Sequence, residues 1–237
     1  MTVFWIASRE LGSYFRRPIA YMVISAFLVM TGLYTFVLTP FFVVGKASLV
    51  SFFEFTPFLF TLFIPAITMK SIAEERSSGM IEILQTWPIS DMSWVLGKFL
   101  GAYFLVSFAI VLTFIFPMCI APFGAIDWGA IIGGYIGLFL LGAAYTALGL
   151  FASAWTSNQI IAFTLGFSLC FAFFIVGRSA VFLEGDLRFV AEFLSFEKRL
   201  SAISRGVLDT RDLVFFMTIV GVSLGLSTER LHLRRWR

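Results

Sequence analysis

Charged side chains are scarce in this chain of 237 residues. Only 13% of the residues are charged and 59% are hydrophobic, whereas a soluble domain is typically about 25% charged and about 45–50% apolar. A soluble fold of this size could not remove so much apolar surface from water, because small globules leave much of their chain exposed. A lipid bilayer accommodates such a composition, since it is itself an apolar solvent. The composition therefore predicts an integral membrane protein.

Residue patterns typical of catalysis are also missing from the sequence. It has no Ser/His/Asp set, HExxH motif or glycine-rich phosphate loop. The single histidine, His232, cannot by itself ligate a bis-histidine haem. Cys119 and Cys170 both stand inside apolar runs, which favours small buried hydrophobes over a disulfide or a metal pair. We therefore expect no enzymatic activity, no metal and no cofactor on this chain.

Six apolar runs are long enough, or nearly so, to cross a membrane. A helix needs about 20 residues to span a hydrocarbon core of about 30 Å, so the shorter second and sixth runs should recruit flanking residues. The inner parts of the runs lack Asp, Glu, Lys, Arg and His, which argues against a proton-coupled pump or a voltage-gated channel. Sodium coupling through carbonyls and hydroxyls stays open. The runs are 19–38, 55–69, 98–120, 130–152, 159–177 and 213–227.

Two amphipathic segments flank these runs. Residues 2–17 alternate apolar and charged side chains at helical spacing and stop at Pro18, which predicts an interfacial helix at the membrane surface. A soluble cap on a neighbouring domain is the alternative. The segment 183–212 predicts short amphipathic helices in the outer interface, with a lipid-surface loop without function as the alternative. The fourth run is rich in small residues that permit close helix packing, within the subunit or at a dimer seam: Gly133, Gly134, Gly137, Gly142, Ala143 and Ala144.

Lys and Arg residues set the expected orientation. With six spans both termini share one side, and that side carries ten of these cations, Lys98 among them, against seven on the other. Five of the seven lie in the long segment 183–212, and long loops count for less in the positive-inside rule. We therefore expect both termini in the cytoplasm, in a multi-pass protein of the bacterial inner membrane.

The most informative polar segment is then cytoplasmic, residues 70–98. Its charges are concentrated in Glu74, Glu75 and Arg76, after which Ser78 is a candidate N-cap for a short apolar helix. Pro88 ends that helix, and Ser90 with Asp91 can cap the helix that leads into the third span. An ordinary connecting loop with solvated charges is the alternative interpretation.

The residues of this loop resemble a known family. The run Glu-Glu-Arg-Ser-Ser-Gly-Met-Ile-Glu-Ile-Leu-Gln-Thr-Trp-Pro-Ile-Ser, residues 74–90, is similar to the first cytoplasmic loop of ABC type-2 permeases. That loop usually reads Glu-Glu-Arg/Lys, then Gly-Thr, Glu-Leu-Leu and Pro-Ile/Val-Ser; Gly79-Met80 departs from it. The segments 14–18, 157–159 and 205–209 also match, in order. The likeness is greatest to gliding-motility-type permeases and to the permease of the nitrous-oxide-reductase maturation transporter.

The resemblance implies a fold and a set of contacts. It implies a single all-α permease domain, 1–237, with six transmembrane helices, which pairs with a second permease copy and docks cytoplasmic ABC ATPase subunits. ATP and Mg would be bound by that ATPase, and a periplasmic or additional membrane subunit can join. The implied ATPase-coupling residues are Glu74, Glu75, Arg76, Met80, Ile81, Glu82, Ile83, Leu84, Gln85 and Thr86, with a second contact at Trp155, Thr156, Ser157 and Asn158.

Two functions follow from this interpretation. The first is the permease subunit of an ABC transporter, which couples ATP hydrolysis on the partner to substrate export. The second is a membrane scaffold of an ATPase-driven envelope machine, for motility or for cofactor or metalloenzyme assembly, that moves no free solute. The sequence leaves the substrate open, because apolar spans without charge admit lipids, peptides, drugs or sulfur species alike.

Overall fold

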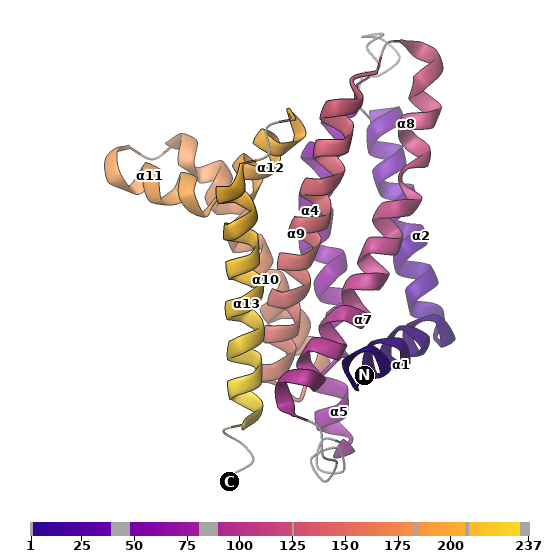
Figure 1. Cartoon of the computed structure of the whole chain (residues 1–237), viewed down its shortest axis with the longest axis vertical. Coiled ribbons are helices and arrows are strands. Elements are labelled where there is room, and N and C mark those ends of the chain that lie inside the picture. The colour runs from indigo at the N-terminus through magenta and orange to yellow at the C-terminus, as the bar shows by residue number, and fades with distance from the viewer. Residues whose placement is uncertain are drawn as a thin grey trace.

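The fold is a bundle of long helices with a shorter helix lying across one end. The computed structural model of the chain describes residues 2–38, 48–80, 90–124, 126–182, 184–206 and 209–232, and every regular element in these ranges is helical (Figure 1). Six of the helices are long and apolar enough to cross a membrane, which confirms the predicted six-span, all-α membrane fold. These stretches are Ala20–Leu38, Val50–Ser77, Asp91–Ile120, Trp128–Trp155, Gln159–Ser179 and Thr210–His232.

The first helix, α1 (Thr2–Arg16), ends where the sequence predicts. Arg17 adopts an extended conformation and is the N-cap of α2 (Pro18–Leu33), with Pro18 in the first turn. Proline fits that position because it has no amide hydrogen to satisfy and its φ is already helical. The chain therefore turns a corner at Arg17, so that α1 lies across the bundle while α2 runs along it (Figure 1). This is the arrangement expected of an interfacial helix.

The shorter apolar runs do recruit flanking residues. Helix α4 (Val50–Thr68) begins before the predicted run, and α13 (Thr210–His232) extends it at both ends. Helix α7 (Asp91–Leu112) begins at the predicted cap, where the Ser90 hydroxyl accepts a hydrogen bond from the Ser93 amide. Lys98 consequently lies about two turns inside α7. The helix therefore extends about two turns beyond the first residue of the predicted run, and the place of Lys98 at the end of the third span stays a prediction.

Helix α9 (Trp128–Trp155) is the centre of the bundle and packs against α4, α7, α10, α12 and α13. Asp127 caps it by accepting hydrogen bonds from the amides of Gly129 and Ala130. A Cβ added at Gly133 would lie 2.3 Å from the Ile203 carbonyl oxygen, and one at Gly134 would lie 2.4 Å from the Phe53 ring. These two glycines therefore serve helix packing within the subunit. Of the two alternatives that the sequence left open, packing within the subunit or at a dimer seam, the first applies to them.

The third span bends between α7 and α8 (Ile115–Ile120). Pro117 has no amide hydrogen to donate to the carbonyl of Thr113, four residues earlier, so the regular ladder breaks there. The buried Tyr135 hydroxyl on α9 donates to the Thr113 carbonyl at 2.8 Å. The Phe116 amide also donates to this carbonyl at 2.9 Å. The carbonyl that lacks its usual partner at Pro117 is thus satisfied from its own chain and from a neighbouring helix, as a bend inside a membrane requires.

The segment before the last span forms the short helices that the sequence predicts. It follows α10 (Gln159–Ser179) and comprises α11 (Gly185–Leu194) and α12 (Phe196–Ser204). Helix α12 packs against α9, whereas α11 projects sideways from the bundle, at the end opposite to α1 (Figure 1). Large apolar side chains of α11 are exposed, namely Leu187, Phe189, Val190 and Phe193. Such a face is typical of a helix in a membrane interface.

Candidate functional site

The predicted coupling segment begins with a short helix, α5 (Ala73–Ser77), directly after the second span. Glu74, Glu75 and Arg76 all lie on α5. Ser78 follows as its C-cap, and its hydroxyl donates to the Glu75 carbonyl at 3.2 Å. Gly79 has a positive φ of 70°, which glycine adopts without a steric penalty, and Met80 is helical and exposed. Ser78 therefore ends α5, and its predicted role as an N-cap of the following segment stays a prediction. The predicted contacts at Ile81, Glu82, Ile83, Leu84, Gln85 and Thr86 lie outside the described residues.

A buried lysine joins α5 to the rest of the bundle. The Lys98 side chain is 1% exposed, and its Nζ lies 2.9 Å from Glu75 Oε1 and 3.3 Å from Glu10 Oε2. It also donates to the Ser71 carbonyl at 2.5 Å. Burying a charge is costly unless it is paired and hydrogen-bonded. Lys98 meets that condition only because α1, α5 and α7 converge on it.

Further polar contacts attach α1 to α5. Arg17 binds both carboxylate oxygens of Glu74 at 3.0 Å, and this hydrogen bonding raises the pKa of the arginine. On the preceding turn, in α1, the Tyr14 hydroxyl lies 2.8 Å from the Ser71 hydroxyl. Burial raises the pKa of Tyr14 well above its usual value, so its phenol stays protonated. We call Glu10, Arg17, Glu74, Glu75 and Lys98 the ion-pair network.

Two glycines let α1 approach α7 closely enough to form the ion-pair network. A Cβ at Gly97 would lie 2.6 Å from Ile6 Cβ, and a Cβ at Gly101 would lie 2.7 Å from Glu10 Cβ. Both distances are shorter than any normal contact between carbon atoms. The four-residue spacing places the two glycines on one face of α7. Sequence reasoning did not single out this pair, although the Gly-x-x-x-Gly spacing is a visible signal for close helix packing.

A single serine on α9 secures the turn between α4 and α5. The Ser153 hydroxyl accepts hydrogen bonds from the amides of Ile72 and Ala73, each at 3.1 Å, and donates to the Met69 carbonyl at 3.1 Å. One turn earlier, a Cβ at Gly149 would lie 2.2 Å from Thr68 Oγ1. The end of α9 is therefore fixed to the base of α5. Sequence reasoning missed Ser153, because a lone serine in an apolar run carries no spacing signal.

The predicted second contact is the turn that follows α9. Trp155 ends α9 and is half exposed, with the Arg230 guanidinium 4.7 Å from its ring centroid. Asn158 caps α10 by accepting a hydrogen bond from the Ile160 amide at 2.9 Å. Thr156 and Ser157 are half buried and exposed, respectively. Helix α5 packs against both α9 and α10, so the two predicted contact segments lie at the same end of the bundle as α1 (Figure 1).

The described residues offer no metal site. Within these ranges no group of three or more His, Cys, Asp or Glu side chains is placed to hold an ion. Cys119 and Cys170 are both free, the first exposed and the second buried, so the disulfide alternative is wrong. The absence of a cofactor stays a prediction.

Comparison with known proteins identifies the family. No curated protein sequence matches the chain. The sequence profile described as ABC-2 family transporter protein matches residues 43–196, which is more than half of the chain. The match includes α5, the base of α7, Ser153 and the turn after α9. Members of this family are typically non-catalytic membrane subunits that work with an ABC ATPase. The chain is a multi-pass membrane protein of the ABC-2 transporter family.

Proposed function

We propose that this protein is the permease subunit of an ABC transporter in the bacterial inner membrane, with α5 and the turn after α9 docked on a cytoplasmic ATPase. The observation that carries the proposal is the connection between these two segments. Ser153 binds the base of α5 through two main-chain amides, two residues before Trp155 ends α9. A displacement of either segment by the ATPase would therefore move both segments together. Such rigid coupling is what the transmission of a conformational change requires.

The ion-pair network extends that body to the first and third spans. Lys98 on α7 binds Glu75 on α5, and Arg17 at the start of α2 binds Glu74. Movement of α5 by an ATPase would thus pass to α1, α2 and α7 without an intervening flexible link. In this proposal both termini are cytoplasmic, a second permease copy completes the pathway, and the solute is exported. No observation favours the scaffold alternative.

Charge reversal on α5 tests the proposal. Arg76→Glu should reduce the ATPase activity of the assembled complex about tenfold, the effect of losing one interface hot spot. The matched control is Arg205→Glu, an exposed arginine at the opposite end of the bundle, which should leave the activity unchanged. Co-purification with the ATPase and its turnover in lipid vesicles are the measurements. Equal activity in the two variants would contradict the docking site.

Glu75→Lys is a less specific variant. Lys98 Nζ lies 2.9 Å from Glu75 Oε1, so this variant replaces the carboxylate with a second cation beside Lys98. It therefore disturbs folding as well as docking. A loss of ATPase binding by Glu75→Lys is therefore interpretable only if the melting temperature of the permease in detergent is unchanged. Arg76 is not a member of the ion-pair network, but its guanidinium is buried, so the same melting-temperature check applies to Arg76→Glu.

A further inference from the structure

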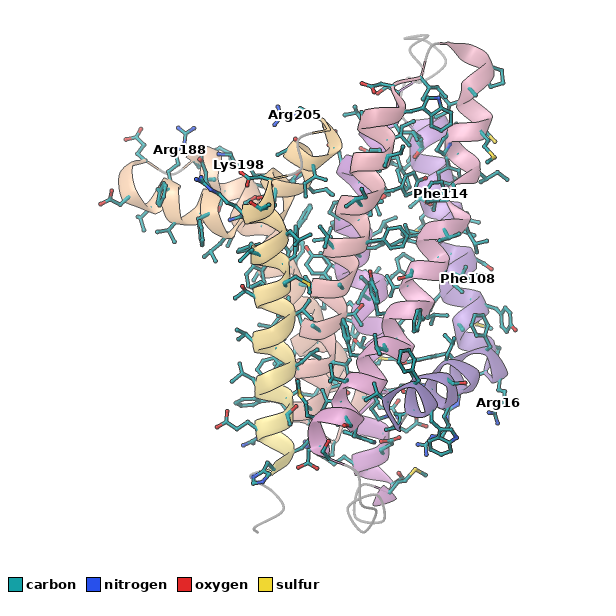
Figure 2. The ribbon with its side chains drawn as sticks, in the orientation of Figure 1. Arg16, Phe108, Phe114, Arg188, Lys198 and Arg205 are labelled. Atoms are coloured by element: carbon teal, nitrogen blue, oxygen red, sulfur yellow. The ribbon has the colours of Figure 1, made fainter. Side chains whose placement is uncertain are left out.

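A cavity of about 630 Å³ lies beneath the corner between α1 and α2. Its inner wall is apolar and comes from three spans, with Ala20 and Val23 on α2, Ile67 on α4 and Leu105 on α7. Arg16 and Lys70 line its polar side, together with the ion-pair network. Figure 2 shows Arg16 at the corner where α1 meets α2. The cavity is therefore amphipathic, with hydrocarbon on one side and positive charge on the other.

The cations of this cavity outnumber its carboxylates by two. The lining carries three carboxylates, Glu10, Glu74 and Glu75, and each already forms an ion pair with Arg9, Arg17 or Lys98. Arg16 and Lys70 are the other two cations in the lining. Among the described residues no carboxylate pairs with either of them; Arg16 donates only to the carbonyl of Gly12, at 3.2 Å. A bound anion would balance this surplus.

The position of the cavity selects the kind of anion. Helix α2 presents apolar side chains outward beside it, including Tyr21 and Met22, which are 56% and 66% exposed. These side chains belong to a spanning helix, so the bilayer reaches the cavity at the level of α1. Basic pockets between spans at this level bind the headgroups of acidic lipids. A soluble anion would use the cations but would leave the apolar wall uncovered.

We propose that this cavity binds one anionic phospholipid. The phosphate lies between Arg16 and Lys70, and the first methylene groups of the acyl chains cover Val23 and Leu105. The lipid would then hold the α1–α2 corner against α4 and α7. This inference does not depend on an ATPase partner, so its test uses the purified permease alone and fails or succeeds separately from the proposed function.

The test is lipid retention by the protein in an uncharged detergent, measured by native mass spectrometry with phosphatidylglycerol or phosphatidylcholine. The wild type should retain phosphatidylglycerol preferentially. The double variant Arg16→Gln/Lys70→Gln should lower that retention about thirtyfold, since each cation near an acidic lipid contributes about fivefold. The matched control Arg188→Gln/Arg205→Gln removes two cations at the opposite end and should not change it.

A second variant tests the apolar wall. Val23→Trp fills the cavity without a change in charge and should also abolish phosphatidylglycerol retention, while the melting temperature in detergent reports whether the variant folds. The proposal is overturned if the double variant or Val23→Trp, once shown to be folded, retains phosphatidylglycerol like the wild type. It is also overturned if the control loses it equally. Stabilisation by inorganic phosphate to the same extent as by the lipid would identify a free-anion site and reject the lipid.

Discussion

The two ends of the bundle hold their charged side chains in different ways. At the end with α1 and α5, ion pairs connect residues 23 to 88 positions apart, and Lys98 at their centre is 1% exposed. At the end with α11, the pairs connect residues 4 to 19 positions apart, and Arg188, Lys198 and Arg178 are each more than half exposed. The first arrangement ties distant helices into one body, whereas the second stabilises a local segment.

One ion pair at the α11 end is an exception, because both of its side chains are largely buried. Arg199 lies 2.5 Å from Asp212 at the start of α13, and its guanidinium is 4.0 Å from the Phe215 ring centroid. It secures α12 to the last span, and it also donates to the Phe193 carbonyl at the end of α11 at 2.9 Å. The apolar face of α11 is nevertheless exposed. The α5 end is therefore connected to several distant helices, whereas α11 exposes its apolar face.

Removal of the central lysine should have the largest effect. Lys98→Met leaves Glu10 and Glu75 buried without their main partner, which should cost about 3–5 kcal/mol of unfolding free energy. Thermal unfolding in detergent is the measurement. Lys198→Met, which removes an exposed lysine at the other end, is the control and should cost little. Neutralising Glu10 and Glu75 as glutamines should recover part of the loss; the same melting temperature for both lysine variants would refute the contrast.

An intermediate effect is expected where α9 meets α4. Gly149→Ala forces a Cβ to within 2.2 Å of Thr68 Oγ1, and such overpacking typically costs about 1–3 kcal/mol. Thr68→Ala removes the clashing hydroxyl, so the double variant should be more stable than Gly149→Ala alone. Gly225→Ala on α13, where nothing lies within 4 Å of an added Cβ, is the control. If the two alanine variants melt at the same temperature, the close approach is not structural.

The smallest effect is expected at α11. Arg188→Gln breaks an exposed pair with Glu192 one turn along the same helix, and such pairs contribute little. Its melting temperature should lie within about 2 °C of the wild type. Hydrogen bonds from Lys198 and Arg188 lower the pKa of Glu192, and the remaining Lys198 bond preserves most of that shift. A large loss of stability would mean that α11 is fixed to the bundle after all.

Much of this fold was predictable from the sequence. Apolar runs locate the six spans, Pro18 locates the corner after α1, and Ser90 marks the first turn of α7, because these signals act on neighbouring residues. The amphipathic spacing of Leu187, Val190 and Phe193 likewise indicates α11. Each of these features depends on side chains within about two turns of one another.

The interactions at the candidate site were harder to predict from the sequence. The motif singled out Glu74, Glu75 and Arg76 as candidate coupling residues. It did not show that Glu75 forms an ion pair with Lys98, or that Glu74 forms one with Arg17. That choice depends on α1 crossing α7 at Gly97 and Gly101, which is a tertiary arrangement. Lys98 itself looked like a residue at the end of a span, because a sequence shows a charge but not the partners that make its burial possible.

The separation between Glu10 and Lys98 also constrains how the protein is made. The chain is synthesised from its N-terminus, and Glu10 precedes its partner by 88 residues. Until the third span has entered the membrane, α1 has neither the Gly97 surface to pack on nor the ammonium group to bind. It must wait at the bilayer surface, where exposed Phe4 and Trp5 can hold it in the interface. Helix α1 and the adjoining Arg17 can bind residues 71–75 once the second span is made, but the packing of α1 is completed only with the third span.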